Sequence, residues 1–181
     1  MRIKKSGYCY WITGLSAAGK TTIANSLASL IRQEGQSVII LDGDVLRSVF
    51  GFSGYSRDER LLTGFKYSKL AQMLVDQGSI VIVSVIGLFK EIHVWNHQNI
   101  ENYVEVFLDV PMKELRRRDP KGLYLSYDQG KVTNVAGVDM QVDFPENPHY
   151  HFKWHSALTG SMVAQDLFED FKMRTSSLNE A

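Results

Sequence analysis

The sequence predicts an α/β fold built on a mainly parallel sheet with helices packed against it. Short runs of apolar and β-branched residues alternate with longer stretches of helical periodicity, and this alternation is typical of such sheets. The chain has 181 residues, of which 44% are apolar, which suits one domain with a substantial core. No repeat or low-complexity tract divides it, so we expect a single domain over residues 1–181.

Three strands and two long helices are expected in the first half. The run Ile-Val-Ile-Val-Ser-Val at residues 80–85 has the composition of a strand buried on both faces. Ile23, Leu27 and Ile31 recur at helical spacing after a glycine-rich turn, and Gly35 suits the end of that helix. The expected elements are strands at residues 8–13, 37–41 and 80–85 and helices at about 20–34 and 59–77.

The second half contains a long segment without periodicity. From residue 119 to 148, Gly, Pro, Asp and Asn replace the helical pattern, and a loop of that length in a compact domain is usually functional, so we predict a lid. Pro111 is well placed to open the helix before it, whereas residues 149–160 carry no clear signal. The remaining expected elements are helices at about 90–98, 112–118 and 161–173 and a strand at 104–108.

Charge and composition exclude several classes of partner. Twenty basic and twenty acidic residues cancel, so no overall field attracts nucleic acid or an anionic membrane. The longest apolar runs are far shorter than the about 20 residues of a membrane span, and the basic start at residues 1–5 leads to no secretory cleavage site. We expect a cytoplasmic protein. Cys9, the one cysteine, is expected to be a small buried side chain rather than a reactive thiol.

A complete G-x-x-x-x-G-K-[ST] pattern lies between the first strand and the first helix. In such a loop, backbone N–H groups cradle phosphates, Lys20 reaches the β- and γ-phosphates, and the Thr21 hydroxyl is a hard oxygen ligand for Mg²⁺. ATP and Mg²⁺ are therefore the expected cofactors, and the absence of an Asn-Lys-x-Asp guanine signature disfavours a GTPase. Ala17 and Ala18 occupy positions that are often Gly or Ser, so we expect the loop to keep φ values that alanine tolerates. The residues expected to bind the nucleotide are Gly14, Ser16, Ala17, Ala18, Gly19, Lys20, Thr21 and Thr22.

Two carboxylates, Asp42 and Asp44, follow the second predicted strand, at the edge where open α/β sheets bind ligands. In a phosphoryl transfer a carboxylate can accept the proton of the acceptor hydroxyl, and Asp44 is the better candidate for this base. We expect Asp42 to assist the metal, although the pair alone would also suit an Asx turn. Arg47, one helical turn beyond Asp44, is expected to hold an anionic group of the acceptor.

Further motifs resemble those of adenylyl-sulfate (APS) kinases. The most specific is Arg-Asp-Pro-Lys-Gly-Leu-Tyr at residues 118–124, and Asp-Gly-Asp-x-x-Arg at 42–47, Gly-Phe-Ser at 51–53 and Pro-Glu-Asn-Pro at 145–148 extend it. The resemblance implies a three-layer α/β/α P-loop kinase fold with a lid over roughly residues 119–148. It also implies transfer of the ATP γ-phosphoryl group to the ribose 3′-hydroxyl of a small nucleotide acceptor, and a homodimer.

The same resemblance implies roles for particular residues. Asp44 would be the catalytic base, and Lys20 and Lys121 the other catalytic groups. Phe52 would stack on the base of the acceptor, and Arg118 would lie near the ATP adenine. The residues that would hold the anionic end of the acceptor are Arg47, Arg57 and Lys121.

The sequence departs from the APS kinase pattern on the acceptor side. The family's Phe-Thr-Gly-Ile-Asp becomes Val-Ala-Gly-Val-Asp at residues 135–139, so a valine replaces an aromatic wall opposite Phe52. Loss of one such wall costs about 1–3 kcal/mol of stacking. A family asparagine becomes arginine, and Ile-Ser-Pro becomes Ile-Gly-Leu. The altered positions expected to line the acceptor pocket are Arg60, Ile86, Gly87, Leu88 and Val135.

These departures resemble a branch of the family that phosphorylates cytidine diphosphoramidate for capsule decoration. We weigh this acceptor slightly above APS, which would give 3′-phosphoadenylyl sulfate in sulfate activation. A catalytically silent nucleotide-binding regulator is a third hypothesis. Lys20, Thr21, Asp44 and Lys121 together argue against it, because ATP binding alone needs no base beside an acceptor.

Two groups of histidines are expected to be structural. His149, His151 and His155 lack a neighbouring cysteine and a predicted element to hold them, so we interpret them as surface histidines rather than a metal site. His93 and His97 lie on the helix predicted after the third strand, where we expect them to pack or face solvent.

Overall fold

The computed structural model describes residues 7–179, with side chains described up to residue 176. The basic start at residues 1–5 lies outside this range. Five parallel strands form one sheet in the order β2-β3-β1-β4-β5. The strands are β1 (Tyr8–Thr13), β2 (Val38–Asp42), β3 (Ile80–Ser84), β4 (Tyr103–Asp109) and β5 (Tyr150–Lys153).

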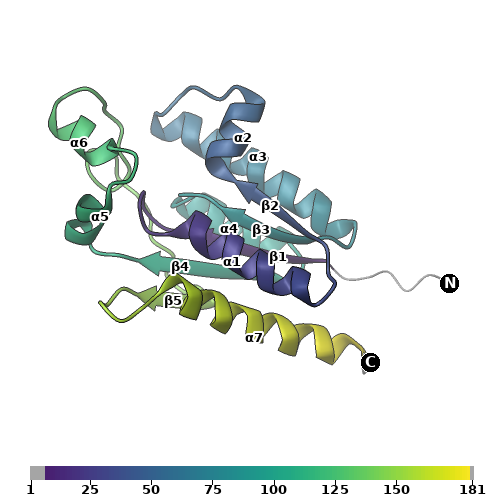
Figure 1. Ribbon diagram of the computed structural model, residues 1–181. Coiled ribbons are helices and arrows are strands. Elements are labelled where there is room, and N and C mark those ends of the chain that lie inside the picture. Colours follow the sequence, from purple (N-terminus) through teal and green to yellow (C-terminus); the bar gives the residue numbers. More distant parts are fainter. Residues whose placement is uncertain (1–6, 180–181) are drawn as a thin grey trace.

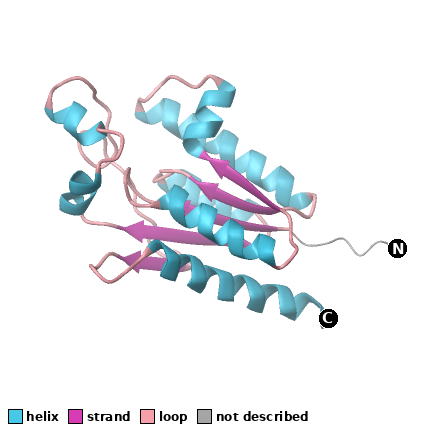
Figure 2. Ribbon diagram, viewed as in Figure 1, coloured by secondary structure: helices cyan, strands magenta, loops and turns pink. Residues whose placement is uncertain are grey.

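Helices cover both faces of the sheet, giving the predicted three layers. α1 (Lys20–Gln33) and α7 (Gly160–Asn179) pack together on one face, in front of the sheet in Figure 1. α3 (Arg57–Asp76) and α4 (Lys90–Asn99) pack together on the opposite face. The arrowheads in Figure 2 share a direction, so the carboxyl ends of the strands gather at one edge.

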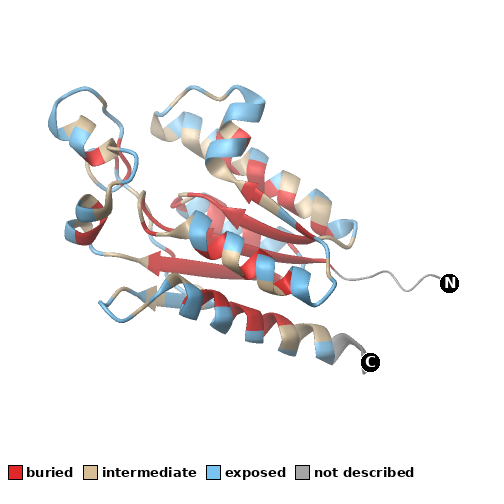
Figure 3. Cartoon of the chain, viewed as in Figure 1, coloured by how far each residue is buried: buried red, intermediate tan, exposed pale blue. Residues whose placement is uncertain are grey.

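The core runs through the central strands, which are buried along their length (Figure 3). Cys9 is fully buried, as expected, and burial raises the pKa of its thiol. Asp170 of α7, only 4% exposed, joins this helix to the sheet. Its carboxylate accepts hydrogen bonds from the Tyr10 hydroxyl of β1 and the Tyr150 hydroxyl of β5, both at 2.8 Å.

Three elements were not predicted. α2 (Gly43–Phe50) begins directly after β2, because the Asp42 side chain accepts from the backbone N–H of Asp44 and Val45 and so caps the helix. α6 (Leu123–Asp128) lies in the segment expected to lack regular structure, and β5 is a four-residue edge strand in the segment without a signal. The predicted α5 (Met112–Arg118) has the expected bounds.

Within the described residues, no helix is both long and apolar enough to cross a membrane.

Candidate active site

The phosphate loop leaves β1 and enters α1 through left-handed backbone. Gly14 lies under β4, where a Cβ atom would sit 2.8 Å from the Leu108 carbonyl oxygen, so a larger residue does not fit. Gly19 caps α1 with φ 98°. Ala17 has φ 65°, which corrects the expectation of alanine-compatible values, since this region disfavours a side chain. The loop therefore stores strain at a residue beside the expected phosphate position.

Lys20 points back into this loop. Its Nζ donates to the Leu15 carbonyl oxygen at 2.7 Å, and burial lowers the pKa of Lys20 to about 8. Asp44 and Asp42 act in the opposite direction on that pKa, and Lys121 acts with the burial. Lys20 therefore lies within electrostatic reach of all three, which come from the end of β2, the start of α2 and the segment after α5.

Three side-chain oxygens gather at the carboxyl ends of β2 and β3. The Thr21 hydroxyl donates to Asp42 Oδ2 at 2.7 Å and lies 3.4 Å from the Ser84 hydroxyl oxygen. The other oxygen of Asp42 caps α2, which fixes the orientation of the carboxylate. A carboxylate and two hydroxyls are hard ligands of the kind that suit Mg²⁺ with retained waters, so these residues fit the predicted metal.

Asp44 and Lys121 form an ion pair through Asp44 Oδ2 and Lys121 Nζ. Their side chains are 71% and 64% exposed, so both groups are open to a ligand. Asp44 lies in the first turn of α2, whereas Lys121 follows α5. The ion pair thus joins two elements that lie far apart in the sequence.

We call residues 119–148 the lid segment. Its contacts with the phosphate loop come from the Tyr124 hydroxyl, which donates to the Ser16 carbonyl oxygen at 3.1 Å, and from Gly137, which packs on Leu15. Next to it, Arg118 donates to Glu114 at 2.7 Å and to the Ala17 carbonyl oxygen at 3.4 Å. Tyr124 was not singled out as a site residue, although it ends the motif at residues 118–124.

Arg47 and Phe52 meet in the loop after α2. The Arg47 guanidinium donates to the carbonyl oxygens of Phe52 and Gly54, at 3.0 and 2.8 Å, and lies over the Tyr55 ring. The Phe52 ring stacks on Phe50 with a centroid distance of 5.5 Å. Arg47 thus shapes the loop that carries Phe52, a task that residue spacing could not reveal.

Arg57 and Arg60 start α3 and contact different parts of the lid segment. Arg57 lies 3.3 Å from Asp143 Oδ2 and 3.3 Å from Glu91. Arg60 donates to the Asn134 carbonyl oxygen at 3.0 Å and to the Tyr55 carbonyl oxygen at 2.9 Å. The two arginines therefore join the start of α3 to the lid segment at Asn134 and at Asp143.

The loop between β3 and α4 packs on the strands below it. The Ile86 carbonyl accepts from the Thr13 hydroxyl, and Leu88, which is fully buried, accepts at its carbonyl from the Asp143 N–H at 2.9 Å. Gly87 lies over the Trp11 indole, where a Cβ atom would be 3.3 Å from Nε1. Val135 is 2% exposed, so its side chain packs inward in this state.

A pocket of about 280 Å³ adjoins the phosphate loop on the opposite side from Asp44. A more open hollow of about 570 Å³ lies between α3 and α4, away from the loop but bordered by Arg57 and Asp143. The lining of the smaller pocket includes Ala18, Gly19, Thr22, Arg118, Phe152 and Trp154. The two aromatic residues were missed, since no element was predicted for residues 149–160.

The sequence matches the family described as adenylylsulphate kinase over residues 6–153. The chain belongs to the adenylylsulphate kinase family. It is 40% identical over 144 residues to the cytidine diphosphoramidate kinase of Campylobacter jejuni, covering 80% of this chain and 85% of that protein. It is also 40% identical over 147 residues to an adenylyl-sulfate kinase of Picosynechococcus, covering 78% and 81%.

Solved structures agree with this family. The Mycobacterium tuberculosis APS kinase CysC, in complex with AMPPNP and APS, has a TM-score of 0.85 and 30% identity, covering 92% of this chain and 98% of that one. As a member of the adenylylsulphate kinase family, the chain is a P-loop kinase. The predicted fold class and the predicted enzyme class are both confirmed.

Proposed function

We propose that this adenylylsulphate kinase family member transfers the γ-phosphoryl group of ATP to the ribose 3′-hydroxyl of a nucleotide acceptor, with cytidine diphosphoramidate as the favoured acceptor. The observation that carries the proposal is the exposed Asp44 carboxylate, held by Lys121 beside the phosphate loop. A carboxylate at this place has no task in nucleotide binding alone, but it suits proton transfer from an acceptor hydroxyl.

The phosphate loop and the neighbouring pocket support ATP as the donor. The triphosphate would lie along residues 14–21, with its γ-phosphate between Lys20 and Asp44. The pocket of about 280 Å³ would then take the adenine, with Arg118 against it. The complex of a family member with AMPPNP supports this assignment.

Thr21 and Asp42 are the residues that would hold Mg²⁺, since their oxygens lie 2.7 Å apart at the end of β2. The ion would supply positive charge against the β- and γ-phosphates. Ser84, 3.4 Å from Thr21, would orient its water shell.

The transfer itself uses groups from both sides of the loop. The acceptor 3′-oxygen forms a bond to the γ-phosphorus, the bond from that phosphorus to the bridging oxygen breaks, and ADP leaves. The hydroxyl proton passes to the Asp44 carboxylate. Lys20 and Lys121 offset the negative charge on the phosphoryl oxygens, so Lys121 would exchange its contact with Asp44 for one with the substrate.

Two arguments favour a cytidine acceptor over APS. The resemblance to APS kinases implies an aromatic wall opposite Phe52 at the position of Val135, a small side chain that is buried here, so a purine would lose a stacking partner. The similarity to the Campylobacter cytidine diphosphoramidate kinase also supports this choice. APS is the alternative, because an adenylyl-sulfate kinase is equally similar in identity.

The test compares the two acceptors in a coupled assay of ATP turnover, with the product followed by ³¹P–¹H correlation to place the new phosphate on the 3′-oxygen. We expect kcat/KM for cytidine diphosphoramidate to exceed that for APS by about tenfold or more, equivalent to one stacking contact. A higher value for APS would overturn the acceptor assignment. Turnover at background with both would favour the catalytically silent regulator.

The single domain, the lid over residues 119–148 and the homodimer belong to the same proposal. The contacts of Tyr124 and Gly137 with the phosphate loop support a lid that closes over the nucleotide. Analytical ultracentrifugation measures the oligomeric state directly, and a monomer at micromolar concentration would contradict the homodimer.

A further inference from the structure

A buried carboxylate, Glu105 of β4, has no role in the proposed reaction. Glu105 is 1% exposed, and its Oε1 accepts from His93 Nδ1 at 2.7 Å and from the Tyr103 hydroxyl at 3.0 Å. Its Oε2 lies 3.2 Å from His97 Nε2. Burial alone would raise the pKa of Glu105, but these hydrogen bonds outweigh it and hold that pKa below the usual value, so the group is a carboxylate.

His93 is enclosed by acceptors at both ends of its ring. Nδ1 faces the Glu105 carboxylate at 2.7 Å, and Nε2 faces the Asp143 carbonyl oxygen at 3.1 Å. A neutral imidazole has one N–H and satisfies only one of these acceptors, whereas the imidazolium donates to both. The side chain is 9% exposed, so water cannot easily replace the missing bond, and the contacts select the doubly protonated ring.

The neighbouring histidines, His149 and His97, have different contacts. His149 Nδ1 accepts from the Glu105 backbone N–H at 3.0 Å, which requires a neutral ring with its proton on Nε2. Burial, together with nearby His97 and Arg174, lowers the pKa of His149 accordingly. His97 stacks on His149 and is 38% exposed, so it can lose its contact with Glu105 to water.

Asp143 contacts both His93 and residues that are predicted for the acceptor side. Its backbone is held at both ends, since its N–H donates to the Leu88 carbonyl at 2.9 Å and its carbonyl accepts from His93. Its carboxylate lies 3.3 Å from Arg57 and 3.3 Å from the Lys90 N–H. Arg57 is a predicted acceptor-binding residue, and Leu88 belongs to the predicted acceptor wall.

We propose that His93 is a positioning residue for the acceptor. As an imidazolium, it clasps Glu105 and Asp143 together. This clasp holds the lid segment at Asp143 and thereby positions Arg57. The proposal rests on the proposed function for its effect on the acceptor. A neutral ring keeps only one of these two hydrogen bonds, so either the Asp143 carbonyl oxygen or the Glu105 carboxylate loses its donor. The clasp therefore acts on acceptor binding, while the ATP side, built on the phosphate loop, is unaffected.

The kinetic test compares His93→Gln with His97→Gln. Both variants remove a histidine contact with Glu105, but only the His93 contacts extend to Asp143 of the lid segment. We expect His93→Gln to raise the acceptor KM about tenfold, equivalent to one charge-assisted hydrogen bond, with the ATP KM within about twofold of the wild type. His93→Arg, a permanent cation with donors at both ends, should bring the acceptor KM back towards the wild-type value. Equal acceptor KM values in His93→Gln and His97→Gln would overturn the proposal.

A second measurement does not depend on any acceptor. Two-dimensional ¹H–¹⁵N spectra of the histidine rings in the wild-type protein report the protonation of each nitrogen. Under mildly acidic conditions we expect both nitrogens of His93 to carry protons, and His149 to be the neutral tautomer protonated on Nε2. If the wild type phosphorylated neither acceptor, the proposed function would fail while these spectra still tested the clasp. A neutral His93 ring under those conditions would overturn the clasp even in an active kinase.

Discussion

At the scale of single residues, Asp44 is the group on which the proposed chemistry depends. Its carboxylate is exposed, lies in the first turn of α2 and pairs with Lys121. Replacement by asparagine keeps the shape and a hydrogen-bond acceptor for Lys121 but removes a proton acceptor of sufficient basicity. The effect should therefore fall on turnover rather than on nucleotide binding.

We predict that Asp44→Asn lowers kcat by about 10²- to 10⁴-fold, the usual contribution of a general base, while the Kd for ATP changes by less than about threefold. Steady-state kinetics and calorimetric titration measure the two quantities. Asp76→Asn is the matched control, because Asp76 is an exposed carboxylate at the far end of α3. Turnover that survives in Asp44→Asn would show that another group accepts the proton.

Lys20 gives a prediction about proton uptake. Burial lowers its pKa to about 8, so near that pH about half of the ligand-free molecules carry a neutral amine. Triphosphate placed against Lys20 favours the charged form and raises its pKa, so ATP binding at about pH 8 should take up about half a proton. Titrations in buffers of different ionisation enthalpy measure this uptake. Lys20→Arg, which stays charged, should show none, and equal uptake in both proteins would contradict the assignment.

At the scale of elements, α7 depends on one buried carboxylate. Burial would raise the pKa of Asp170, but hydrogen bonds from Arg174, Tyr10 and Tyr150 outweigh it, and the pKa lies below the usual value. A lowered folded-state pKa means that the stabilisation is complete above the unfolded-state pKa and is lost as the pH falls through the folded-state value.

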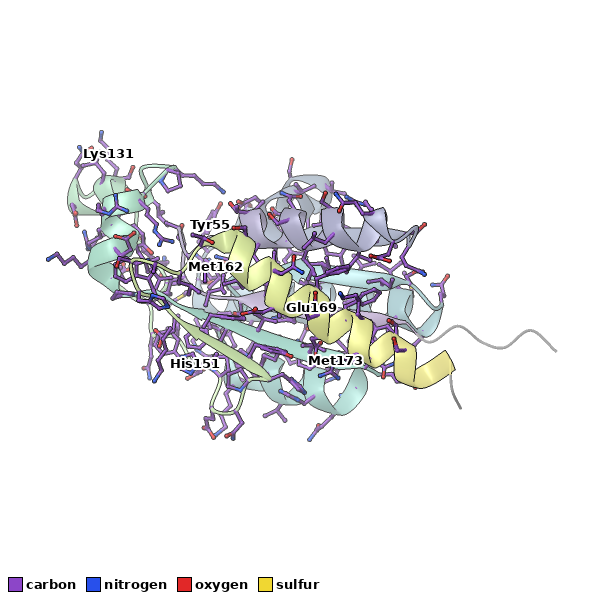
Figure 4. The ribbon with its side chains drawn as sticks, turned by 60° about the horizontal axis from the view of Figure 1, so that its bottom comes forward. Tyr55, Lys131, His151, Met162, Glu169 and Met173 are labelled. Carbon is purple, nitrogen blue, oxygen red and sulfur yellow. The ribbon has the colours of Figure 1, made fainter. Side chains whose placement is uncertain are left out.

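We predict that Asp170→Asn lowers the free energy of unfolding by about 2 kcal/mol at neutral pH, since it weakens hydrogen bonds to a charged group. The difference from the wild type should shrink as the pH falls below the usual range for aspartate. Urea unfolding at several pH values measures both effects. Glu169→Gln is the control, because this neighbouring carboxylate is 51% exposed and contacts Lys172 and Gln165 of its own helix, and it should leave the unfolding free energy nearly unchanged (Figure 4 shows its place on the helix).

The elements whose bounds could be predicted from sequence are those with residues that mark their ends. β1, α1 and α5 came out close to their predicted bounds, because glycine turns and a proline mark their ends. α2 was missed because Asp42, which caps this helix, was assigned to the metal instead. In the structure one oxygen of Asp42 caps α2, and the other contacts Thr21 of the expected metal site. β5 was missed because four residues with alternating burial at a sheet edge carry almost no hydrophobic pattern.

The candidate site shows the same limit. The phosphate loop and Asp44 were predicted because a motif places them beside a strand end. The left-handed Ala17 was not, since backbone conformation in a tight loop follows from its tertiary contacts rather than from residue type. His93 was expected merely to pack or face solvent, and only the three-dimensional contacts with Glu105 and Asp143 indicate its charge.

At the scale of the whole molecule, the carboxyl edge of the sheet gathers groups from the entire chain. The lid segment reaches the phosphate loop through Tyr124 and Gly137, and it reaches the acceptor side through Asn134 and Asp143. The lid segment therefore contacts both the nucleotide side and the acceptor side of the site. Binding of ATP and the acceptor should then order this segment jointly.

Proteolysis reports this ordering, because the outer turn of the lid segment carries an exposed lysine. Lys131 lies at the far end of the molecule from the end of α7 (Figure 4) and follows Gly130, whose φ is 68°. We predict that trypsin cuts after Lys131 in the ligand-free protein, and that ATP together with the acceptor slows this cut about tenfold or more, since local opening must precede cleavage. Lys131→Gln assigns the cut, and mass spectrometry of the fragments over time measures its rate. Cleavage that ATP and acceptor together leave unchanged would contradict a lid that closes on the substrates, because a segment in contact with both of them cannot open without releasing one.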